Sequence, residues 1–151
     1  MKQEYDSFRA VAGFDPCGIR MHYVRYDDKT LEHLSNIGYS FDTTEFDKTN
    51  GGSIKPEYQV GKMWEFPLTI MDSYLPQGTD AAKKTTLQIL EECRKAGLQY
   101  ITVLFHDFHY CEDYIELKEW YRWLIKYFAD SEEYSFISYE EAIMEKSKGK
   151  E

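Results

Sequence analysis

The chain has 151 residues, 42% hydrophobic and 30% charged, which excludes an intrinsically disordered protein and allows one globular domain with a substantial core. Its formal net charge of −9 disfavours phosphate backbones and anionic lipid surfaces, so neither nucleic acid nor a membrane is expected as a partner. No apolar run is long enough to cross a membrane, and residues 1–6 lack the apolar core of a signal peptide, so we expect a cytoplasmic protein. The three cysteines are widely spaced and predict neither disulfides nor a zinc knuckle.

Helical periodicity and short apolar runs alternate along the chain. Glycines and N-cap residues mark several of the expected helix ends. The expected elements are, in order, a helix over 2–12, a strand over 18–23, a helix from Asp27 or Asp28 to Gly38, a strand over 39–41, a loop over 42–61, a strand over 63–71, a helix over 80–96, a strand over 100–105, a helix over 113–128, a strand over 134–137, and a last helix opened by the capping box of Ser138 and Glu141. We expect one domain over 1–146 and a frayed tail over 147–151.

The predicted fold class is α/β with parallel strands. Continuous apolar strands that alternate with helices are typical of a parallel sheet that helices cover. The strand over 63–71 contains Pro67, which cannot donate to a sheet ladder and must lie at an unpaired site or a bulge.

Polar side chains follow three of the predicted strands. Arg20 and His22 end the first strand, Asp72 follows the strand over 63–71, and His106 follows the strand over 100–105. Function in parallel α/β folds gathers at the carboxyl ends of strands, so these side chains are expected to lie near one another. A histidine that an aspartate orients can give and take protons near neutral pH, which makes the set a candidate for acid–base catalysis.

Structural roles compete with this interpretation at each position. Arg20 has many acidic partners to pair with, Asp72 and Ser73 could form an ordinary turn, and a single histidine after a strand is more often structural. His106 and His109 form an H-x-x-H pattern, but residues i and i+3 of an extended chain point to opposite faces unless the chain turns. A metal site at this pair is therefore not expected.

Three segments, in order, resemble the later motifs of the polysaccharide deacetylases, the NodB-homology family. They are GIRMHY at 18–23, WEFPLTIMDS at 64–73 and VLFHDFH at 103–109. The phrase GIRMHYVRYDDKTLEHLSNIGYSFDTT is similar to a branch linked to bacterial surface polysaccharides. The resemblance covers about Gly13 to Ile143. It implies the C-terminal half of a partial (β/α) barrel and a hydrolase that removes acetyl groups from amino sugars, with an acetylated carbohydrate as substrate.

The resemblance also implies roles for individual residues. Arg20 would orient the catalytic base, Asp72 would hold His106, and His106 would be the general acid that protonates the departing amine. His22 stands where the family usually has proline and is counted with the catalytic set. Tyr23 and Trp64 would bind substrate.

The family holds a divalent metal, zinc or similar, through an Asp-His-His set in its early motifs, and the catalytic base lies there too. Nothing in residues 1–17 matches those motifs, so the metal ligands are not found in this chain. Two interpretations stay open. The chain is an enzyme half that a complementary N-terminal half or a second copy completes, or it is a non-catalytic remnant that binds glycans or assembles with a partner. A flavodoxin-like module is a third, but no glycine-rich phosphate loop follows any strand.

Overall fold

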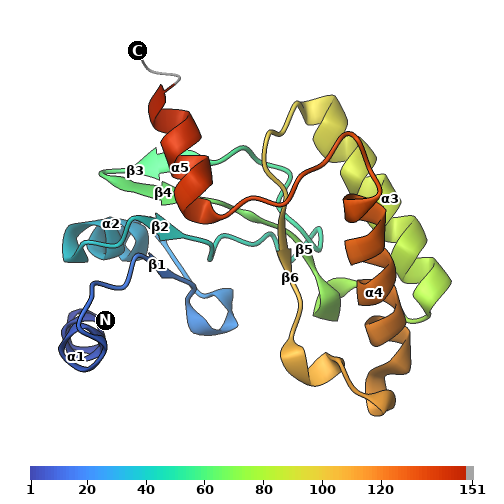
Figure 1. Ribbon diagram of the computed structural model, residues 1–151, viewed down its shortest axis with the longest axis horizontal. Coiled ribbons are helices and arrows are strands. Elements are labelled where there is room, and N and C mark those ends of the chain that lie inside the picture. The colour runs from blue at the N-terminus through green and yellow to red at the C-terminus, as the bar shows by residue number, and fades with distance from the viewer. Residues whose placement is uncertain (149–151) are drawn as a thin grey trace.

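A computed structural model of the protein describes residues 1–148 (Figure 1). Its helices are α1 Lys2–Ala12, α2 Asp28–Ile37, α3 Thr79–Ala96, α4 Ile115–Ala129 and α5 Tyr139–Lys148. Its strands are β1 Gly18–Ile19, β2 Phe41–Asp42, β3 Tyr58–Val60, β4 Met63–Glu65, β5 Leu68–Met71 and β6 Thr102–Leu104. Four short 3-10 turns are η1 His22–Val24, η2 Asp72–Tyr74, η3 Asp107–His109 and η4 Glu112–Tyr114.

The strands form two sheets. The first has the order β1-β2-β4-β3, in which β1, β2 and β4 are parallel and β3 is antiparallel to β4. The second is the parallel pair β5-β6. Figure 1 shows α3 and α4 side by side next to this pair. Tyr139, the first residue of α5, stacks on Phe41 of β2 with the ring centroids 4.4 Å apart. The α/β class with parallel strands is therefore confirmed.

The helices follow the local signals of the sequence. Asp27 caps α2 by accepting a hydrogen bond from the backbone N–H of Thr30 at 2.7 Å, and Gly38 ends that helix. Ser138 and Glu141 form the expected capping box, with the Glu141 carboxylate accepting from the Ser138 N–H at 2.9 Å and the Ser138 hydroxyl accepting from the Glu141 N–H at 3.2 Å. No helix within residues 1–148 is long and apolar enough to cross a membrane.

The predicted strands were less accurate than the helices. The run over 63–71 is two strands in two different sheets, because the chain leaves one ladder at Phe66 and Pro67 and joins another at Leu68. The expected loop over 42–61 contains β3, which pairs with β4 as a hairpin. The first strand stops at Ile19, since the chain turns into η1 with Tyr23 at a φ of 57°.

The strand predicted near the C-terminus was wrong. Residues 134–137 form no strand; the ring of Tyr134 packs on Phe128 of α4 at 5.1 Å between centroids, while Phe136 is 64% exposed. The tail expected from residue 147 is still helical at residues 147 and 148, and the rest of it, 149–151, lies outside the described residues.

The core beside β5 and β6 is built around Trp120 of α4, which has no exposed surface. Its indole N–H donates to the Thr86 hydroxyl of α3 at 2.9 Å, and that hydroxyl donates to the Ala82 carbonyl at 2.8 Å. A buried indole therefore keeps its hydrogen bond, as buried polar groups require. This packing holds α3 and α4 against the strands whose ends carry the polar cluster described below.

The first sheet buries two neighbouring carboxyl groups. Asp42 of β2 and Glu65 of β4 are paired in the sheet register, and both are fully buried. Asp42 Oδ1 accepts from the Thr44 hydroxyl at 2.6 Å, and Glu65 Oε1 accepts from the Glu45 N–H at 2.8 Å. Their other oxygens meet no donor among residues 1–148, so one proton shared between the two carboxyls satisfies both. Burial and the adjacent Asp42 raise the pKa of Glu65 to about 9.

We predict that Glu65→Gln makes the free energy of unfolding less dependent on pH. The folded protein keeps a proton on Glu65 up to about pH 9, whereas the unfolded chain loses it near 4.5, so the wild type loses stability as pH rises through this interval. Glutamine has no such proton to lose, and its amide can still donate to Asp42. Thermal unfolding at pH 6 and pH 9 measures the difference, with the exposed Glu32→Gln as control. An equal fall in Tm for wild type and Glu65→Gln would contradict proton sharing at this pair.

Candidate functional site

The carboxyl ends of β5 and β6 lie side by side and carry the main polar cluster. Met71 and Leu104 are register partners at the ends of this parallel pair. Asp72 follows β5 directly, and His106 comes two residues after β6. The sequence interpretation placed both residues at neighbouring strand ends, and the structure brings them into contact.

The Asp72 carboxylate accepts four hydrogen bonds. Oδ1 accepts from the Ser73 N–H at 2.7 Å and contacts His106 Nδ1 at 2.6 Å. Oδ2 accepts from the His106 N–H at 2.7 Å and contacts His109 Nδ1 at 2.7 Å. The side chain has no exposed surface, so these donors replace the water that the carboxylate has lost.

His109 is the member of the cluster that the sequence interpretation left out. His106 is the N-cap residue of η3, and His109 is the last residue of that turn. A 3-10 turn has three residues per turn, so side chains at i and i+3 lie on the same side. The backbone N–H of His109 donates to the His106 carbonyl at 3.0 Å, which closes this turn. The expectation that the H-x-x-H pair would point to opposite faces was therefore wrong, because the chain turns immediately after the strand.

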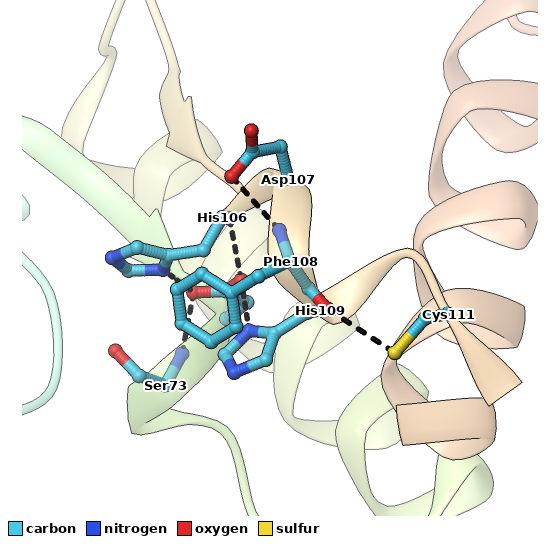
Figure 2. Close-up of polar contacts among 7 residues, drawn as sticks. Ser73, His106, Asp107, Phe108, His109 and Cys111 are labelled. Atoms are coloured by element: carbon cyan, nitrogen blue, oxygen red, sulfur yellow. Dashed lines mark hydrogen bonds and ion pairs between the residues drawn. The ribbon is translucent and has the colours of Figure 1, made fainter. Parts of the chain in front are cut away.

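The contacts with Asp72 determine which ring nitrogens carry hydrogen. A carboxylate can only accept, so the Nδ1 atoms of His106 and His109 are the donors, and the Nε2 atoms are left to exchange protons. Figure 2 shows both rings with the second nitrogen on the side away from the dashed contacts. The His106 side chain is 35% exposed, whereas that of His109 is 9% exposed. His106 is therefore the better placed of the two to meet a ligand from solvent.

Aromatic side chains surround the cluster and are open to solvent. The His109 ring packs against Phe108 at 4.2 Å and Tyr114 at 4.6 Å between centroids. Phe108 is 57% exposed, and Tyr74, two residues after Asp72, is 42% exposed. Exposed aromatic rings beside a polar cluster offer flat apolar surface to a ligand.

The hydrogen bonds of Arg20 go to the first sheet. Its Nε donates to the Thr43 hydroxyl at 2.7 Å and to the Thr43 carbonyl at 3.2 Å, across β1 and the end of β2. It lines a groove of about 840 Å³ together with Tyr100, Phe128 and Tyr139. Burial raises the pKa of Tyr139, and the Arg20 cation opposes that shift. Within residues 1–148, no hydrogen bond or ion pair joins Arg20 to Asp72 or His106.

The remaining predicted residues are divided between two places. His22 and Tyr23 form η1 after β1, with ring centroids 4.0 Å apart, and both are exposed. Trp64 lies in β4 and is partly buried. The structure therefore brings Asp72 and His106 together and leaves Arg20, His22, Tyr23 and Trp64 with the first sheet.

The cluster also has the donor set of a metal site. Asp72, His106 and His109 each offer one ligand atom, and these atoms lie within 4.8 Å of one another. One carboxylate and two imidazoles are a common set for zinc and related ions. The donors therefore suit a divalent transition metal as well as a proton.

Comparison of the chain with protein-family models, with curated proteins and with solved structures found no match.

We predict that Asp72→Asn lowers the free energy of unfolding by about 1–3 kcal/mol, the usual penalty for a buried group that loses its partner. In either orientation the new amide NH₂ faces a backbone N–H, of Ser73 or of His106, that then has no acceptor. Chemical denaturation measures the loss.

The control is Asp107→Asn, because the exposed Asp107 side chain accepts a single bond from the Phe108 N–H at 2.8 Å. Asp107→Asn should change the free energy of unfolding by no more than about 0.5 kcal/mol, as is usual for surface substitutions. Equal losses for the two variants would show that the four-donor arrangement does not hold this strand end together.

Proposed function

We propose that the protein is a carbohydrate-amide hydrolase module of the polysaccharide deacetylase kind, in which His106 and Asp72 transfer the proton to the departing amine. The observation that carries the proposal is the 2.6 Å contact between His106 Nδ1 and a fully buried Asp72, at the adjacent ends of two parallel strands. The order of the three motifs supports the same family. In this proposal the two sheets belong to part of a (β/α) barrel.

Asp72 and His106 have distinct roles in this chemistry. The nitrogen of an amide is a poor leaving group until it is protonated, so cleavage requires an acid at hydrogen-bond distance. With Nδ1 committed to Asp72, His106 donates from Nε2 and takes the proton back from water afterwards. The Asp72 carboxylate keeps the ring in this tautomer and stabilises its positive charge. A divalent metal, expected from the resemblance, would supply hydroxide and polarise the carbonyl, and its ligands would come from the early motifs that residues 1–17 do not match.

The aromatic surface supports a sugar as the substrate. Phe108, Tyr114 and Tyr74 are all exposed near the strand ends that carry Asp72 and His106. Their rings can stack on the apolar face of a pyranose while His106 meets the acetamido group. Acetylated amino-sugar oligomers are therefore the proposed substrate class.

The test is acetate release from acetylated amino-sugar oligomers, measured over a range of added Zn²⁺ or Co²⁺ from none to excess. We expect His106→Gln to lower the rate by about 10²–10⁴-fold, the usual contribution of a general acid. The exposed His33→Gln in α2 is the matched control and should leave the rate unchanged. A folded wild-type chain that releases no acetate at any metal concentration would contradict hydrolysis by this chain.

A second candidate function is glycan binding without catalysis, and the exposed aromatic rings favour it. In that case Phe108→Ala should weaken saturable binding of the oligomer, while His106→Gln should leave it nearly unchanged. Titration calorimetry separates the two functions, because hydrolysis requires the proton on His106 and stacking does not. Absence of saturable binding would exclude this second candidate.

A further inference from the structure

We propose that Asp72, His106 and His109 form a binding site for one divalent transition-metal ion of the Zn²⁺ class. The inference goes beyond the proposed function, since the family's expected metal ligands come from other motifs and His109 has no part in that chemistry. It depends on three side chains that two strand ends and one 3-10 turn bring together.

The donor atoms suit zinc better than calcium or magnesium. Imidazole nitrogens select Zn²⁺, Co²⁺, Ni²⁺ or Cu²⁺, whereas Mg²⁺ and Ca²⁺ prefer sites made of oxygen alone. Two neutral imidazoles and one carboxylate also match three-ligand zinc sites, in which a fourth position stays open for water. His106 is partly exposed, so an ion can reach the cluster from that side. The net charge of −9 favours the approach of any cation.

The site is held in place before any ion arrives. The backbone N–H groups of Ser73 and His106 fix the Asp72 carboxylate at 2.7 Å each. The turn that closes between His106 and His109 holds the backbone of both residues so that their rings lie on one side of η3. Outer hydrogen bonds of this kind orient metal ligands and raise affinity.

The distances allow an ion to replace the hydrogens between these groups. His106 Nδ1 and His109 Nδ1 lie 2.6 and 2.7 Å from the two Asp72 oxygens. Bonds from zinc to nitrogen or oxygen are about 2.0–2.2 Å, so the donors around one ion stand farther apart than two hydrogen-bonded atoms do. Small side-chain rotations supply that space. Each neutral imidazole then carries its single hydrogen on Nε2 instead of Nδ1, so binding at Nδ1 changes the tautomer of both rings.

A metal ion bound at this site would also affect catalysis. This consequence rests on the proposed function. While the ion holds Nδ1 of His106, the ring no longer donates to Asp72, and the proton-transfer pair is broken. Excess metal is therefore inhibitory at this site. The same three residues hold either a proton for transfer or an ion.

The first measurement follows the histidine ring signals of the unmodified protein by NMR as Zn²⁺ is added. The chain has four histidines, which provide two reporters in the site and two controls, His22 and His33. We expect the signals of His106 and His109 alone to move, and the change to be complete at one equivalent. No change, or equal changes at all four, would overturn the proposal.

The second measurement is the affinity for Zn²⁺, from competition with a chromogenic chelator. Loss of an outer-shell partner already weakens metal binding about 10–100-fold, so loss of a ligand in His109→Gln should weaken it at least about 100-fold. His106→Gln should do the same at a more exposed position, which guards against a folding defect at the buried His109. His33→Gln should bind like the wild type. Equal affinity in all the variants would overturn the site.

The third measurement separates this inference from the proposed function. If acetate release occurs, excess Zn²⁺ should suppress it with a midpoint that matches the measured affinity, and His109→Gln should move both midpoints together. If folded protein binds one Zn²⁺ but releases no acetate, the metal site stands and the hydrolase proposal fails. If acetate is released and no Zn²⁺ binds at the cluster, the hydrolase proposal stands and the metal site fails.

Discussion

The Asp72 carboxylate is the constraint on which the second sheet and its polar edge depend. It lies fully buried after β5, and its four donors all come from its own turn or from the segment after β6. Burying a carboxylate without hydrogen-bond donors costs free energy. The ends of β5 and β6 therefore cannot separate without exposing Asp72 to solvent or leaving it buried without donors. The same bonds place His106 and His109 on one side of η3. One interaction therefore joins the two strand ends and positions both histidines.

The first sheet contains carboxyl groups in a different environment. Asp42 and Glu65 are as deeply buried as Asp72, but each receives one strong hydrogen bond and faces the other. Two neighbouring negative charges without water repel each other, so the pair retains a proton and the pKa of Glu65 rises to about 9. The difference between the two sites is the supply of donors. N–H groups surround Asp72, whereas a shared proton serves Asp42 and Glu65.

The two proposals for the Asp72 cluster follow from one property of imidazole. Its nitrogens bind either a proton or a metal ion, and Asp72 assists in both cases. The proposed hydrolase needs the proton on His106, and the proposed metal site needs the ring nitrogen free of it. Arg20 follows β1 of the first sheet and contacts Thr43, and it lines one side of an aromatic groove that β6, α4 and Tyr139 complete. The cluster therefore contains fewer of the predicted site residues than the motifs alone implied.

The helices, the fold class and the Asp72–His106 pair could be predicted from the residues in order, because helical periodicity, caps and the position after a strand are local properties. Asp27 and the Ser138–Glu141 box mark helix starts through bonds three residues apart. Strand pairing depends on residues that are distant in the sequence. The sequence alone therefore did not show that the run over 63–71 divides between two sheets, or that residues 134–137 form no strand. His109 joined the cluster because a 3-10 turn, closed by backbone hydrogen bonds, brings residue i+3 back over residue i.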